Sequence, residues 1–165
     1  MRRTFDPQII ACFNRDLFAV LNLMKIPDDV YQRVFELSTD LINASEAEDT
    51  RDYWRIYSEL RGYCEEQAQS DRDHPFLWET LADFTDDSRV AIGLYERALG
   101  HAERVNAASY EASIKFALAE RYKALGDSQQ AYDYALAANE KAKSLDDLDL
   151  RKQISEFLLN ESKKD

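Results

Sequence analysis

ASIKFALAERYKALGDSQQAYDYALAANEKA, residues 112–142, has the pattern of two helices joined by a tight turn. Gly126 can adopt the left-handed conformation that commonly ends a helix. Asp127 or Ser128 can then cap the next helix, because a short polar side chain accepts hydrogen bonds from its free N–H groups. This stretch therefore predicts a pair of packed helices.

The same arrangement recurs upstream, at intervals of 38 and 40 residues. Equivalent positions carry apolar or aromatic side chains. These sets are Tyr53, Ala91 and Ala131; Tyr57, Tyr95 and Ala135; Leu60, Ala98 and Ala138; and Cys64, Ala102 and Ala142. A recurring helix pair predicts a helical repeat in which neighbouring units bury a continuous core.

The third unit resembles a tetratricopeptide repeat at positions Leu118, Ala119, Tyr122, Gly126, Asp127, Ala131 and Ala138. The middle unit carries a partial match in Trp78, Leu81 and Ala82. The resemblance covers roughly residues 28–145 and implies an all-α fold, an α-α superhelix of about three helix pairs. It also implies that the first helix of each pair faces a protein partner.

The repeats depart from the tetratricopeptide pattern in ways that leave two other folds open. Their period exceeds the usual length of about 34 residues, which predicts longer helices. Ala82 and Ala119 replace a usual glycine, and Thr85 stands where an aromatic residue is expected. Another α-α solenoid or a plain helical bundle would also fit such degenerate repeats.

The composition agrees with an all-α protein. Among 165 residues there are 4 Gly and 3 Pro, too few for the turns of a many-stranded β-sandwich or barrel. Hydrophobic residues make up 45% and charged residues 32% of the chain, which excludes a disordered tail and a membrane span. One domain is the expectation for this length.

Two further helices flank the repeats. Asp6-Pro7 is a helix start, and apolar side chains recur after it at helical spacing up to Met24. At the other end, residues 146–149 start a last helix whose apolar face can cover the end of the stack. We therefore divide the single domain, 1–165, into an N-terminal helix in 1–27, three helix pairs in 28–145, and a C-terminal capping helix and tail in 146–165.

The cysteines and the N-terminus favour a cytoplasmic location. Cys12 and Cys64 both lie in segments with an apolar period, which predicts buried free thiols. Arg15 and Asp16 interrupt the apolar stretch near the N-terminus, so the sequence predicts no signal peptide.

No catalytic or metal-binding motif stands out. His74 and His101 have no second histidine or carboxylate at the spacing of a metal site. His101 also lacks the nearby Lys-Gly pair that would resemble a phosphotransfer histidine. Trp54, Trp78 and the tyrosines recur at helical spacing, which favours core packing over a ligand platform. We expect no enzyme activity, no cofactor and no metal.

Negative charge is concentrated in the middle of the chain. The formal net charge is −11, and residues 28–106 hold nineteen acidic against eight basic residues. Residues 1–27 hold four basic against two acidic residues. An acidic surface repels nucleic-acid phosphates and attracts basic proteins, although solubility alone would also explain it.

These features predict a non-catalytic module that binds one basic protein partner, with no direct contact to nucleic acid or membrane. The sequence leaves open an immunity or inhibitor protein of a toxin, a secretion or assembly chaperone, and an adaptor. The alternative is a structural protein that forms homodimers through the apolar N-terminal helix. The expected groove residues are Phe76, Glu79, Asp83 and Asp86 in the second unit and Ser113, Phe116, Glu120 and Lys123 in the third.

Overall fold

The computed structural model describes residues 25–162, and within this range all regular structure is α-helical. The helices are α2 (Asp28–Glu46), α3 (Thr50–Gln67), α4 (Pro75–Asp83), α5 (Ser88–Arg104), α6 (Ala108–Ala124), α7 (Ser128–Ala142) and α8 (Leu148–Glu161). None of these helices is long and apolar enough to cross a membrane. The predicted N-terminal helix and residues 163–165 lie outside the described range.

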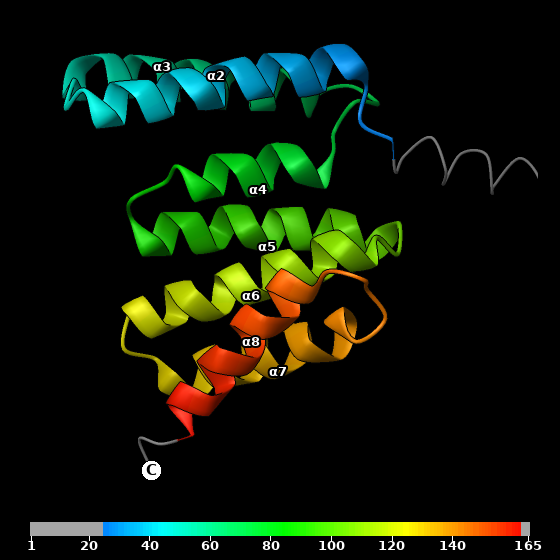
Figure 1. Cartoon of the computed structure of the whole chain (residues 1–165). Coiled ribbons are helices and arrows are strands. Elements are labelled where there is room, and N and C mark those ends of the chain that lie inside the picture. The colour runs from blue at the N-terminus through cyan, green and yellow to red at the C-terminus, as the bar shows by residue number, and fades with distance from the viewer. Residues whose placement is uncertain (1–24, 163–165) are drawn as a thin grey trace, which may run out of the picture.

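Consecutive helices pack as pairs, α2 with α3, α4 with α5 and α6 with α7. The second helix of each pair then packs on the following helix, and α8 closes the series by packing on α7. Figure 1 shows the resulting stack, with α2 and α3 at one end and α7 and α8 at the other. The fold is an all-α, α-α superhelix, which confirms the predicted fold class.

An aspartate starts the second helix of each pair. The side chains of Asp49, Asp87 and Asp127 accept hydrogen bonds from backbone N–H groups in the first turns of α3, α5 and α7, at 2.8–3.1 Å. These aspartates are separated by the same 38 and 40 residues as the aligned core positions. Asp147 caps α8 in the same way. The repeat therefore extends to the caps as well as to the core.

The turn before two of these caps has the same backbone geometry. Gly126 has φ +79°, and the N–H of Asp127 donates to the carbonyl of Tyr122 at 3.0 Å. In the first pair, Glu48 has φ +56°, and the N–H of Asp49 makes the equivalent bond at 2.9 Å. Both turns end a helix with one left-handed residue. The turn predicted at Gly126 is confirmed.

Gly126→Val should lower the free energy of unfolding by about 1 kcal/mol or more, because a β-branched residue resists the left-handed conformation. A Cβ at this position would meet no atom within 4 Å, so the cost comes from the backbone and not from a clash. Thermal unfolding followed by circular dichroism measures the difference. Gly62→Ala, inside α3, is the control and should stabilise by about 0.5–1 kcal/mol. Equal melting of Gly126→Val and wild type would contradict this account of the turn.

The aligned repeat positions form the core. Tyr53 is partly buried, and the other residues of the four aligned sets are buried. Their side chains shrink along the stack, from Tyr57 and Leu60 in α3 to Ala135 and Ala138 in α7. Small residues let α6 and α7 approach closely, and among the helices of residues 25–162 these two share the most extensive contact.

The expectation of longer helices is wrong for the second pair, because α4 has only 9 residues. Pro75 starts this helix, and the hydroxyl of Thr85 follows its end and donates to the carbonyl of Leu81 at 2.7 Å. The same hydroxyl lies 2.8 Å from that of Tyr57 in α3. Thr85 therefore replaces the expected aromatic residue with a buried polar link between two helix pairs.

Cys64 is a buried free thiol, as predicted. Its Sγ donates to the carbonyl of Leu77 at 3.4 Å, and burial raises its pKa to about 12. The thiol is therefore protonated at neutral pH and unreactive. Cys12 lies outside the described residues.

Candidate protein-binding surface

The first helices of successive pairs touch one another through side chains. The ring of Tyr31 in α2 stacks on that of Phe76 in α4, with centroids 5.5 Å apart. The hydroxyl of Ser113 in α6 donates to the carboxylate of Glu79 in α4 at 2.5 Å. α2, α4 and α6 therefore share one continuous surface. We call it the first-helix surface, made of Tyr31, Phe35, Phe76, Glu79, Asp83, Tyr110, Ser113 and Glu120.

Three carboxylates of this surface form an acidic cluster: Glu79 and Asp83 in α4 and Glu120 in α6. Partial burial raises the pKa of Glu79 to about 7 despite the hydrogen bond from Ser113, and the charge of Asp83 adds to the rise. Desolvation likewise raises the pKa values of Asp83 and Glu120, although both residues reach the surface. Arg121 lowers both values in part. The protein therefore compensates this negative charge only partly.

Two hydrogen bonds position the acidic cluster. The hydroxyl of Tyr95 in α5 donates to the carboxylate of Asp83 at 2.5 Å. The guanidinium of Arg121 in α6 donates to the carbonyl of Ala82 in α4 at 3.3 Å. The packing of three helices therefore sets where the acids lie.

Aromatic side chains lie beside the acidic cluster. Tyr31 stacks on Phe76 and also on Phe35, whose centroid is 6.2 Å away. Tyr110 lies one turn before Ser113, whose hydroxyl hydrogen-bonds both Glu79 and the carbonyl of Tyr110. Burial raises the pKa of Tyr110, and Glu79 and Tyr31 add to the rise. The side chain of Phe35 is 54% exposed among the described residues. We call Tyr31, Phe35, Phe76 and Tyr110 the aromatic cluster.

A pocket of about 370 Å³ opens next to Tyr110. Its walls come from α6, from the turn before α8 and from the first turn of α8, and they combine hydroxyl, apolar and acidic side chains. They are Ser109, Tyr110, Ser113, Leu145, Asp146, Asp147 and Leu150. A pocket of this size can take an apolar side chain of a partner, with carboxylates at hand for a cation.

Most of the predicted groove residues meet on the first-helix surface. The structure brings together Phe76, Glu79, Asp83, Ser113 and Glu120. It does not bring Asp86 to them. Asp86 lies on the turn before α5 and lines a different pocket, beside the turn between α2 and α3.

Phe116 and Lys123 face α8 rather than an open groove. The ring of Phe116 packs edge-on against that of Phe157, with centroids 5.7 Å apart, and is 7% exposed. Lys123 Nζ lies 2.8 Å from a carboxylate oxygen of Glu161 and 4.6 Å from the ring of Phe157. α8 therefore covers these two residues, and they are not part of the candidate surface.

The repeat alignment did not predict the part of the surface that comes from Tyr31, Phe35 and Tyr110. The first unit matched the repeat pattern weakly, so no groove residues were assigned to α2. A signal was nevertheless present, because Tyr31, Phe35 and Ile42 follow one another at helical spacing beside the buried stripe of α2.

Both histidines have structural roles. His74 Nδ1 accepts a hydrogen bond from the N–H of Phe76 at 3.1 Å and so caps α4. His101 Nε2 lies 3.0 Å from Asp73, which also accepts from the indole N–H of Trp78 at 2.7 Å. Within residues 25–162, no group of three or more His, Cys, Asp or Glu side chains could hold a metal ion.

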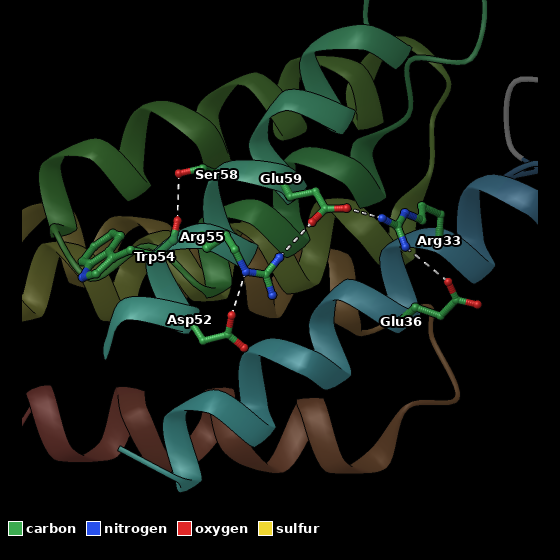
Figure 2. Close-up of polar contacts among 7 residues, drawn as sticks. All are labelled: Arg33, Glu36, Asp52, Trp54, Arg55, Ser58 and Glu59. Atoms are coloured by element: carbon green, nitrogen blue, oxygen red, sulfur yellow. Dashed lines mark hydrogen bonds and ion pairs between the residues drawn. The ribbon is translucent and has the colours of Figure 1, made fainter. Parts of the chain in front are cut away.

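One flank of α2 is charged, and its side chains pair within the chain. Figure 2 shows Arg33 bound to Glu59 of α3, and Arg55 bound to Asp52 and Glu59. Arg33 also lies 3.5 Å from Glu36. Exposed ion pairs of this kind contribute at most about 1 kcal/mol each. This flank therefore offers a partner fewer free charges than the acidic cluster does.

Glu79→Gln should flatten the pH dependence of stability between about pH 5 and pH 8. Because the pKa of Glu79 is raised in the folded protein, the folded state holds a proton that the unfolded chain has already released. The wild type therefore loses stability as the pH rises from about 4.5 to about 7, and the loss levels off above that. Gln keeps an acceptor for Ser113, and we expect the variant to be more stable by about 1–3 kcal/mol at pH 8.

The measurement is urea unfolding of both proteins across this pH range. Glu120 and His101 also have shifted pKa values, but they are present in both proteins and cancel in the difference. Asp83 interacts with Glu79, so the difference includes the coupling of these two carboxylates. A pH-independent difference between the two proteins would show that Glu79 is ionised throughout.

No protein-family model matches the sequence, and no curated protein does. Among solved structures, the crystal structure of PcrH from Pseudomonas aeruginosa is similar to this chain, with a TM-score of 0.50. The match covers 85% of this chain and 97% of PcrH, at 20% sequence identity. At this identity the likeness concerns the fold alone, and it supports an all-α stack of helix pairs.

Proposed function

We propose that the protein is a non-catalytic interaction module that binds one basic protein partner along the first-helix surface. The observation that carries this proposal is the acidic cluster, positioned by three helices directly beside the aromatic cluster and the pocket. A partner segment with basic residues around an apolar anchor fits this surface. The anchor would enter the pocket, and the basic side chains would face the carboxylates.

The electrostatics of the free protein support a cationic partner. Burial makes the ionised form of Glu79 costly, and a Lys or Arg of a partner would stabilise that form. The surrounding stretch, residues 28–106, has an excess of acidic residues and would steer a basic protein toward the surface. The same charge repels phosphates, which argues against nucleic acid as the ligand.

Three biological roles fit such a module: an immunity or inhibitor protein that masks a basic toxin, a secretion or assembly chaperone, and an adaptor. Each role holds one client protein and needs no chemistry from the chain. The free buried thiol of Cys64 is consistent with a protein that functions in a reducing compartment, which we take to be the cytoplasm.

Capture from the native host, followed by mass spectrometry, tests the proposal. The full chain serves as bait at about 0.05 M and at about 0.5 M NaCl, because surface electrostatics weaken as the Debye length falls. A single enriched protein with a basic contact region, lost at high salt, is the expected result. An acidic partner or a salt-independent one would contradict it. Light scattering of the purified chain measures its molar mass and so tests the alternative function. A stable dimer without a partner would favour a structural protein that forms homodimers.

A further inference from the structure

α2 carries a second apolar stripe, which we call the outer stripe: Tyr31, Phe35 and Ile42. These side chains are 46%, 54% and 49% exposed. They lie about 100° around the helix from the stripe that faces the core. That buried stripe is Val30, Val34, Leu37, Leu41 and Ala44. The opposite flank is the charged one of Figure 2, so α2 has apolar side chains on two adjoining faces.

At the other end of the stack, the terminal helix α8 covers a neighbouring position of α6. Counted back from the caps Asp49 and Asp127, Phe35 corresponds to Ser113, and Ser38 corresponds to Phe116. Phe116 is buried because Phe157 of α8 packs on it. Within residues 25–162, Phe76 of α4 stacks on Tyr31, whereas Phe35 and Ile42 stay about half exposed.

We propose that residues 7–24 of the same chain dock on the outer stripe of α2. This segment carries apolar residues at helical spacing: Ile9, Ile10, Phe13, Leu17, Val20, Leu21 and Met24. Only residues 25–27 join it to α2, and Ile26 packs against the core beside the start of that helix. A tether this short keeps the segment at a high local concentration next to Tyr31.

The length and charge of the segment fit this position. As a helix, residues 7–24 extend about 27 Å, and the outer stripe from Tyr31 to Ile42 extends about 17 Å. Run antiparallel to α2, the segment places Leu17 near Phe35. Residues 1–27 hold four basic and two acidic residues, whereas residues 28–106 are strongly acidic, so the two parts attract each other.

Photo-crosslinking of the purified full-length chain tests this docking, with p-benzoylphenylalanine in place of Phe35. Equal amounts of unlabelled and ¹⁵N-labelled protein are mixed, irradiated and digested, and crosslinked peptides are identified by mass spectrometry. We expect crosslinks to residues 7–24 that join light to light or heavy to heavy peptides only. The control places the probe at Trp54 of α3, which is 48% exposed, and should give no crosslink to this segment.

Mixed light–heavy peptides would identify a second copy of the chain as the occupant and overturn the proposal. Absence of any crosslink to residues 7–24 would overturn it as well. Leu17→Glu in the probe-bearing protein should abolish the crosslink, with circular dichroism confirming that the repeat is folded. The docked segment would cover Tyr31 and Phe35 and leave the acidic cluster and the pocket to the partner of the proposed function. No external partner enters this assay, so failure of the docking and failure of the proposed function can be told apart.

Discussion

Reversal of Glu79, Asp83 and Glu120 to Lys is expected to weaken binding of the captured partner by about 100-fold or more. The three carboxylates lie on adjoining helices and are compensated only in part by Arg121. Reversal places three cations against a basic segment, and like charges across an interface cost several kcal/mol, where about 2.7 kcal/mol corresponds to 100-fold. Titration calorimetry at low and high salt measures both the affinity and its salt dependence.

A matched control changes the net charge equally on the second helices. Glu66→Lys, Glu96→Lys and Asp133→Lys alter exposed acids of α3, α5 and α7, and should reduce affinity by less than about tenfold. If both triple variants bind equally well, long-range charge acts alone and the acidic cluster is not the site. Unchanged affinity of the first variant at every salt concentration would remove the acidic surface from the proposal and leave the fold intact.

A second variant is needed because two of these acids also accept hydrogen bonds within the protein. Ser113 donates to Glu79 and Tyr95 donates to Asp83, so replacement by Lys has a cost in stability as well. Glu79→Gln, Asp83→Asn and Glu120→Gln together keep the acceptors and remove the charge. We expect this variant to melt at or above the wild-type temperature and to bind about tenfold more weakly, with a smaller salt dependence.

The caps and the core of this fold could be predicted because they depend on residues close together in the sequence. Gly126 and Asp127 form one turn by local geometry, and Asp49 and Asp87 repeat the cap at the register of the buried positions. Ala91 and Ala131, which the alignment treats as equivalent positions, therefore also have equivalent places in the structure: each is buried in the first turn after an aspartate cap. The short α4 was missed because its end depends on Thr85 and Tyr57, which meet only in the folded chain.

The site was predicted only in part, for a reason of the same kind. Glu79, Asp83 and Glu120 follow from the resemblance to the tetratricopeptide pattern, which assigns the partner-facing positions within single helices. Phe116 and Lys123 are covered by α8, and this contact depends on how the chain turns after α7. No pattern of neighbouring residues in the sequence predicts that turn. The stacking of Tyr31 on Phe76 likewise needs two pairs in contact. Sequence spacing thus identifies faces, whereas tertiary packing decides which faces stay open.

Replacement of both Lys115 and Lys141 by Met is expected to lower the free energy of unfolding by about 3–5 kcal/mol. Glu111 in α6 is 2% exposed, and its carboxylate lies 3.4 Å from Lys115 Nζ and 2.5 Å from Lys141 Nζ of α7. Burial acts to raise the pKa of Glu111, but the two lysines outweigh it and hold this pKa below its usual value. Without them, the folded state contains a buried carboxylate with no cation.

For a chain of this length the loss corresponds to a fall of about 6–20 °C in melting temperature at pH 7, measured by calorimetry. With the lysines gone, burial should raise the pKa of Glu111. The variant then recovers part of the loss as the pH falls, because the folded state binds a proton that the unfolded chain does not. Addition of Glu111→Met should recover most of it at pH 7, since an apolar group of similar size needs no counter-ion.

Lys152→Met is the control for removal of a lysine, because its pair with Glu156 is exposed and 3.9 Å long. It should change stability by less than about 1 kcal/mol. If the double variant melts like this control, the ion pairs of Glu111 do not hold α6 on α7. If Glu111→Met fails to recover the loss, the cost lies in the packing of the lysine stems rather than in the unpaired charge.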